Sequence, residues 1–144
     1  MNRNDMYDTF QNTKFQYYYP ISFVKRNKSY LCTNVPRKIH WCYGDTILIV
    51  FDIRDLDCDP ETTFEDTKVQ ITFYDFRGEE VFSMISDDDD TCIDIEEMTV
   101  SLIFDREQSL KIKKGVYSCS VALIYDEVDY QTILRREDCE IHVR

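Results

Sequence analysis

Glycine and proline are scarce in this chain, since each occurs only three times in 144 residues. An average protein has about 7% glycine, so loops that depend on glycine for unusual backbone angles are nearly absent. Turns must rely instead on aspartate and asparagine, which tolerate left-handed backbone and form local hydrogen bonds. The glycine-rich loops that bind phosphates and dinucleotides are also missing, so we expect no nucleotide cofactor, and no other cofactor is indicated.

Long apolar runs and positive net charge are missing as well. No stretch approaches the roughly 18 consecutive apolar residues of a membrane span, and the first eight residues lack the apolar region of a secretion signal. The net charge of −11 argues against general nucleic-acid binding. With 43% hydrophobic and 14% aromatic residues, the chain can nevertheless bury a core, which excludes a disordered linker. We therefore expect a globular protein with no membrane and no nucleic-acid partner.

Closely spaced cysteines are also absent, although the chain has six cysteines. No CxxC pair exists, which excludes zinc ribbons and fingers. The expectation is free, mostly buried thiols in a protein made in a reducing cytoplasm. If any bridge formed, Cys42 is the partner that we would suspect for Cys119.

Charge is unevenly distributed along the chain. Residues 1–41 carry seven basic and two acidic side chains, a net of +5, and the remainder carries a net of −16. A basic arm joined to an acidic body suits docking onto neighbours of the same kind, although the asymmetry can also be incidental. We place the boundary after residue 42: an extended N-terminal arm or edge strand at 1–42, and a β-sandwich at 43–144.

The arm contains a concentration of aromatic residues before and around Pro20. Aromatic side chains are frequent anchors in interface cores, so the run is a candidate docking element. The alternative is an edge strand that packs on its own sandwich. Under the docking hypothesis, a chain without residues 1–24 should still fold. The candidate interface residues are Phe15, Tyr17, Tyr18, Tyr19 and Phe23.

The body shows a period of two, which is typical of half-buried strands. Residues 47–53, 69–74, 79–85, 98–104, 117–125, 130–134 and 138–143 each alternate in this way. Asp75–Gly78 predicts a hairpin turn, and Asp105 predicts the N-cap of one helical turn. About seven short strands with frequent turns predict an all-β protein with a β-sandwich fold.

Four adjacent aspartates are the most conspicuous charged run. Hard cations such as calcium bind carboxylate oxygens, so the run is a weak candidate metal site. It lacks the alternating spacing of a calcium-binding loop, and a solvated turn between two strands is the other interpretation. The candidate residues are Asp87, Asp88, Asp89 and Asp90.

Catalytic groups are few. His40 and Cys42 would share one face of a strand, but no oxyanion hole or orienting acid is evident beside them. The acidic groups Asp55, Asp57, Asp59 and 96–97 resemble surface acids more than a glycosidase pair. We therefore expect no enzymatic activity and no catalytic residue.

The segment 113–119, Lys-Lys-Gly-Val-Tyr-Ser-Cys, resembles the D-x-G-x-Y-x-C of immunoglobulin domains, in which the tyrosine forms a tyrosine corner. Trp41 precedes the body, however, so the disulfide-and-tryptophan core is not reproduced. Gly44-Asp-Thr46, Asp75–Gly78 and Ser109–Tyr117 resemble the immunoglobulin-like domains of tailed-phage virion proteins. The likeness covers about 43–144, and the general composition is similar to proteins of crAss-like phages.

This resemblance implies an immunoglobulin-like β-sandwich of about seven strands in a non-enzymatic virion protein. The expected role is an auxiliary capsid or decoration protein, or a head-fibre attachment protein, docked through its N-terminal arm. The implied partners are the major capsid protein or other virion proteins, with self-association as a further alternative, and the implied location is the virion. A tail, baseplate or collar component and a glycan-binding host-adhesion module are the alternative functions.

Overall fold

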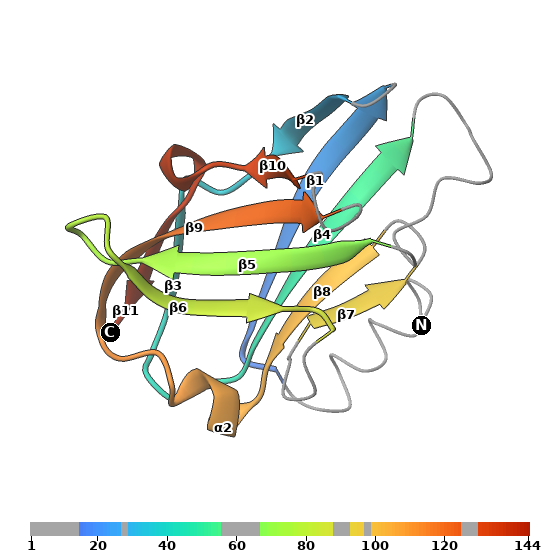
Figure 1. Cartoon of the computed structure of the whole chain (residues 1–144). Helices are drawn as coiled ribbons and strands as arrows, with labels where there is room; N and C mark the ends of the chain where they lie inside the picture. The colour runs from blue at the N-terminus through green and yellow to red at the C-terminus, as the bar shows by residue number, and fades with distance from the viewer. Residues whose placement is uncertain (1–14, 27–28, 56–66, 88–92, 97–98, 125–129) are drawn as a thin grey trace.

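The computed structural model describes residues 15–26, 29–55, 67–87, 93–96, 99–124 and 130–144, which form two β-sheets packed face to face (Figure 1). The first sheet contains β1 (Tyr17–Arg26), β2 (Ser29–Asn34), β4 (Ile47–Asp55), β7 (Ile93–Glu96) and β8 (Thr99–Phe104). The second contains β3 (Lys38–Trp41), β5 (Lys68–Tyr74), β6 (Glu80–Ile85), β9 (Gly115–Ile124), β10 (Tyr130–Leu134) and β11 (Glu140–Val143). The all-β sandwich expected from the two-residue period is confirmed.

In both sheets, strands that are distant in the sequence lie side by side. The first sheet runs β2-β1-β4-β8-β7, and the second runs β3-β11-β9-β5-β6, with β10 also paired to β9. The pairs β4–β8, β8–β7, β11–β9, β9–β5 and β5–β6 are all antiparallel. The period of two predicted the strands, whereas this order became visible only in three dimensions.

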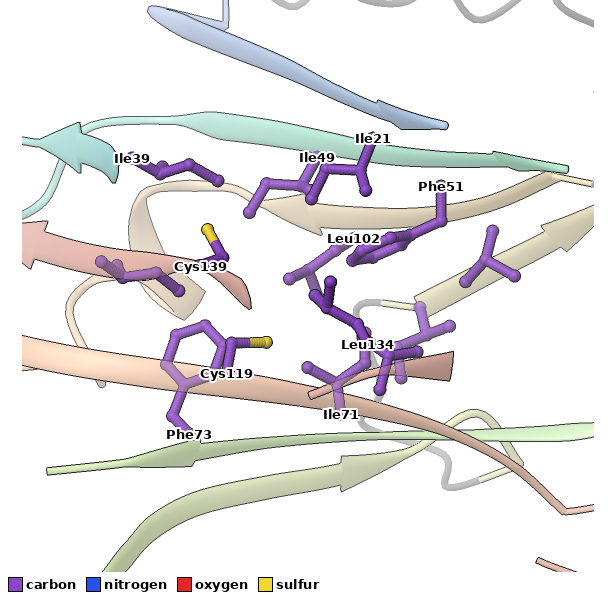
Figure 2. Packing of buried hydrophobic residues seen from close by; sticks show 14 of the residues in the cluster. Ile21, Ile39, Ile49, Phe51, Ile71, Phe73, Leu102, Cys119, Leu134 and Cys139 are labelled. Atoms are coloured by element: carbon purple, nitrogen blue, oxygen red, sulfur yellow. The ribbon is translucent and has the colours of Figure 1, made fainter. Parts of the chain in front are cut away.

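Alternation along each strand explains how the core forms. Successive side chains point to opposite faces of a sheet, so every second residue of each strand meets the other sheet. Figure 2 shows the result: Ile49, Phe51 and Leu102 from the first sheet face Ile71 and Phe73 from the second. These five side chains are almost completely buried.

The predicted turn and helix cap are both confirmed. In the turn at 75–78, the Asp75 carboxylate accepts hydrogen bonds from the backbone N–H groups of Arg77 and Glu79, at 2.8 and 3.0 Å. Gly78 has φ of +81°, a conformation that glycine adopts without strain. The Asp105 carboxylate caps α2 (Arg106–Ser109) by accepting from the Gln108 N–H at 2.8 Å. No helix in the described ranges has the length and apolar character needed to cross a membrane.

Tyr117 forms the tyrosine corner that the resemblance implied. Its hydroxyl donates to the Lys113 carbonyl at 2.6 Å, four residues upstream and near the start of β9. This is the position of a tyrosine corner at the start of strand F in an immunoglobulin sandwich. This hydrogen bond links the segment between α2 and β9, which crosses from the first sheet to the second, to β9 itself. The turn after α2 is therefore fixed relative to the core.

The N-terminal segment differs from the expected arm. β1 pairs in parallel with β4, from Tyr17 opposite Ile47 to Lys25 opposite Asp55, and pairs antiparallel with β2 on its other side. β3 forms the other end of the segment and joins the second sheet through β11. Residues 17–26, 29–34 and 38–41 therefore belong to the sandwich, and the domain extends N-terminal of the expected boundary at residue 43. The reason is that the apolar faces of these strands complete both sheets.

Phe73 should be essential for stability, because its ring is buried between the sheets. Phe73→Ala should lower the free energy of unfolding by about 3–5 kcal/mol. Phe76→Ala, three residues away at an exposed site, should change it by less than about 0.5 kcal/mol. Urea unfolding followed by circular dichroism measures both values. Equal losses in the two variants would contradict the assigned positions of these rings.

Removing residues 1–24 should prevent folding, contrary to the sequence-based expectation. The deletion takes away most of β1, including the buried side chains of Ile21 and Phe23, from between β2 and β4. A chain that starts at Phe15 retains every described strand and is the matched control. Thermal unfolding should show a cooperative transition for the control only. A cooperative transition in the longer deletion would show that β1 is dispensable.

Candidate interaction surface

Arginine and aromatic side chains gather where the β5–β6 turn meets the 3₁₀-helix η1 (Arg136–Asp138) at one end of the second sheet (Figure 1). We call Tyr74, Phe76, Arg77 and Arg136 the arginine–aromatic surface. The side chain of Phe76 is 79% exposed. Exposed aromatic rings beside arginines match the composition of binding hot spots rather than that of an average surface.

The local geometry holds these side chains in place. The Arg77 guanidinium lies 5.3 Å from the centre of the Phe76 ring, and the Arg136 guanidinium lies 4.8 Å from the centre of the Tyr74 ring. Both distances are in the range of cation–π interactions. Arg136 also donates to the Gly78 carbonyl at 3.3 Å, which joins η1 to the β5–β6 turn. The surface is therefore organised before any partner binds.

A shallow hollow of about 400 Å³ lies between the turn and η1. Phe76, Ser118 and Arg136 line it together with the carboxylate-bearing Glu137 and Glu140. Charges of both signs therefore surround an aromatic ring. Burial raises the pKa of Tyr130, and the nearby Tyr74 and Glu80 raise it further.

Hydroxyl groups cover the neighbouring outer face of the second sheet. The Tyr74 hydroxyl lies 3.3 Å from Ser120 Oγ, and Thr72 Oγ1 lies 3.2 Å from Ser83 Oγ. Gln70 donates to the same Ser83 Oγ at 3.2 Å. These cross-strand bonds fix the orientation of Tyr74 and hence of the ring on which Arg136 stacks.

The candidate interface residues of the N-terminal run divide between the two faces of the first sheet. Tyr17, Tyr19 and Phe23 point inward and pack on the main core, and Phe23 is almost completely buried. The Tyr19 hydroxyl donates to the His40 carbonyl at 2.6 Å, which links β1 to β3. These side chains hold the sandwich together, as in the alternative that the sequence left open.

Phe15 and Tyr18 belong to a second, smaller cluster on the outer face of the first sheet. Phe15 is buried against Leu48 and Val50, with Tyr18 and Ile103 beside them. Gln16 anchors this end of the strand, because its backbone N–H donates to the Thr46 carbonyl at 3.0 Å and its side chain accepts from the Thr46 N–H at 3.2 Å. The structure thus does not gather the five aromatic residues into one surface.

Sequence reasoning did not find the arginine–aromatic surface, although it predicted the turn at 75–78. The available signal was a phenylalanine placed inside a turn, where no core can cover it. Arg136 lies far away in the sequence, so nothing local indicated that it would join Phe76 and Arg77. Sheet pairing between β5, β9 and β10 brings η1, which follows β10, close to the β5–β6 turn.

The described residues include only some of the acidic candidates. Asp87 forms an exposed ion pair with Lys68 at 3.0 Å, whereas Asp88, Asp89 and Asp90 lie outside the described residues. Asp57 and Asp59 lie outside them as well. Among the residues that the structure describes, no group of three histidine, cysteine or acidic side chains is arranged to hold a metal ion. The metal hypothesis for 87–90 thus stays a prediction.

Within the described residues, no hydrogen bond joins His40 to Cys42 as a nucleophile–base pair would require. The Tyr17 hydroxyl instead approaches Cys42 Sγ at 4.0 Å, and the Tyr17 ring lies edge-on to the His40 ring, with centres 6.1 Å apart. Burial raises the pKa of Tyr17, and its bond to Cys42 raises it further. His40, in β3, and Cys42, just after the end of β3, are both exposed.

Cys119 has a different neighbour from the one suspected. Cys42 is exposed, whereas β11 pairs with β9 so that Glu140 faces Ser118. Continuing this register by one residue places Cys139 opposite Cys119, and both side chains lie in the core (Figure 2). Both are free thiols, as are Cys32 and Cys42. Burial raises the pKa of Cys139 to about 11, and it raises that of Cys119 far above its usual range.

No protein-family model matches the chain, and no curated protein matches it. Among solved structures, the chain is similar to the N-terminal domain of phage TP901-1 ORF48, with 11% sequence identity and a TM-score of 0.46. The match covers 89% of this chain and 98% of that chain.

The described cysteines should differ sharply in reactivity. Alkylation requires the thiolate, so at about pH 8 iodoacetamide should label Cys42 in the native protein and leave Cys119 and Cys139 unlabelled. All three should react after denaturation, and peptide mapping by mass spectrometry identifies each site. The Cys42→Ser variant provides the control for assignment. Equal native labelling of Cys42 and Cys139 would contradict the burial of β11.

Proposed function

We propose that this chain is a non-enzymatic structural component of a bacteriophage virion and that it binds neighbouring virion subunits. The likeness of Gly44–Thr46, Asp75–Gly78 and Ser109–Tyr117 to immunoglobulin-like domains of tailed-phage virion proteins supports the class of protein. The observation that supports binding is the arginine–aromatic surface, which a rigid sandwich presents to solvent.

Within a virion, the proposed role is an auxiliary capsid or decoration protein, or a head-fibre attachment protein. The proposed partner is the major capsid protein or another virion protein. Aromatic and arginine side chains that are fixed before binding lose little conformational entropy on association, so they favour a specific interface. The docking element proposed here is the arginine–aromatic surface, because Tyr17, Tyr19 and Phe23 are committed to the sandwich.

Location in the particle is the first test. Particles purified by density gradient from lysates of the source phage should contain the chain, detected by mass spectrometry at a constant ratio to the major capsid protein. The non-structural proteins of the same lysate serve as the negative control. Presence in the lysate together with absence from the particles would refute the proposed location.

The binding surface is tested by the Phe76→Ala/Arg136→Ala double variant. Loss of the exposed ring and of the stacked guanidinium should weaken docking by at least about tenfold, because such residues dominate interface energies. Particle occupancy, measured by mass spectrometry, should fall accordingly. Leu31→Ala removes an apolar side chain of similar exposure, 66%, from β2 and should leave occupancy unchanged. Equal occupancy in both variants would exclude this surface.

Glycan binding is the second candidate function, and the same exposed Phe76 favours it. An aromatic ring flanked by Glu137 and Arg136 provides a flat apolar face with polar groups beside it. A glycan array distinguishes the two functions. Binding of a defined glycan that Phe76→Ala abolishes, with unchanged particle occupancy, would favour adhesion over assembly.

A further inference from the structure

The free edge of the second sheet carries a groove beside β6. β6 is the last strand of this sheet, and in the described part of the chain no strand pairs with its outer side. The groove has a volume of about 290 Å³ and lies next to the first half of the strand. Its lining residues are Val81, Phe82, Lys111, Ile112, Lys113 and Tyr117.

The floor of the groove is apolar, and its far wall is fixed. Phe82, Ile112 and Tyr117 supply the floor, and Ile112 is almost completely buried. The wall is held by three hydrogen bonds: Ile112 N–H donates to the Ser109 carbonyl at 3.1 Å, the Tyr117 hydroxyl to the Lys113 carbonyl, and the Tyr43 hydroxyl to the Leu110 carbonyl at 3.0 Å. The side chain of Val81 is 50% exposed at the rim. The groove is therefore preformed and partly uncovered.

The rim of the groove is positively charged, in contrast to the chain as a whole. Lys111 and Lys113 line the groove and are exposed, and Lys114 is the next exposed residue, whereas the net charge of the chain is −11. None of the three forms an ion pair with any residue that the structure describes. Edge strands often carry lysines that discourage unwanted pairing, but those lysines lie on the strand itself. Here Lys111 and Lys113 belong to a separate segment, between α2 and β9, that lines the groove together with β6.

We propose that this groove binds an extended, acidic segment of a partner protein, which adds as a further strand along β6. Main-chain hydrogen bonds to β6 provide affinity, and the alternation of the added strand provides specificity. One set of its side chains enters the apolar floor beside Phe82 and Tyr117, and the neighbouring carboxylates meet Lys111 and Lys113. The six residues of β6 accommodate a segment of about six residues. This inference concerns a second surface and stands whether or not the chain is a virion component.

Labelled hexapeptides added to the full chain test the proposal by fluorescence anisotropy at low salt. An Asp-Val-Asp-Val-Asp-Val peptide should bind, whereas the corresponding Lys-Val repeat should not. A third peptide keeps the acidic sequence but carries N-methyl groups on its valines, which removes backbone donors. It should bind at least about fivefold more weakly if a strand is added. Failure of the acidic peptide to bind, or equal binding of all three, overturns the proposal.

The Lys111→Glu/Lys113→Glu variant locates the binding site. It should weaken binding of the acidic peptide by at least about tenfold. Lys38→Glu/Arg144→Glu makes the same change in net charge elsewhere on the exposed surface and should weaken binding by less than about twofold. Circular dichroism confirms that each variant is folded. Equal weakening in the two variants would show a general charge effect and refute the groove as the site.

Analytical ultracentrifugation of the chain without peptide tests whether a second copy of the chain fills the groove instead. The proposal expects a monomer. Dimerisation that Lys111→Glu/Lys113→Glu abolishes would overturn the partner assignment, because the groove would then be filled by a second copy.

Discussion

Packing around the ring of Phe73 is the interaction on which most of this structure depends. Its ring centre lies 6.3 Å from that of Phe104 in the opposite sheet, 6.0 Å from that of Phe82 in the neighbouring strand, and 6.4 Å from that of Tyr117 in β9. It therefore joins the two sheets and also the strands that flank β5. Both proposed binding regions are built outward from this cluster. The turn that carries Phe76 begins two residues after Phe73, and the groove beside β6 has Phe82 and Tyr117 as its floor.

Aromatic side chains have two roles in this protein, and position in the backbone decides which role each has. Tyr17, Tyr19 and Phe23 lie on a regular strand, where every second side chain faces the opposite sheet. Phe76 lies in a turn, where the backbone leaves the sheet and no second layer can cover the ring. The Asp75 carboxylate holds that turn through two backbone N–H groups, so the backbone that carries the exposed ring is fixed. An aromatic-rich stretch is thus a poor guide to an interface unless its local geometry is known.

Features that depend on neighbours in sequence were predicted well. The strands at 47–53, 69–74 and 117–124 follow from alternation, the turn at 75–78 from Asp75 and Gly78, and the cap of α2 from Asp105. The tyrosine corner at Tyr117 involves a carbonyl only four residues away, so a short motif was sufficient to indicate it. The candidate site was not predicted, because its parts come from β5, the β5–β6 turn and η1. Of its two arginines, only Arg77 is adjacent to Phe76 in the sequence.

By itself, the sequence determined most strands of the body, their two faces, the turn at 75–78 and the cap of α2, because these follow from side-chain periodicity and from the local hydrogen bonds of aspartate. Tertiary structure alone decided that β1 pairs in parallel with β4, that Cys139 rather than Cys42 neighbours Cys119, and that Arg136 stacks on Tyr74. The physical reason is that each of these depends on register between strands distant in the chain. Such register is selected by the burial of both sheet faces together, and no local pattern encodes it.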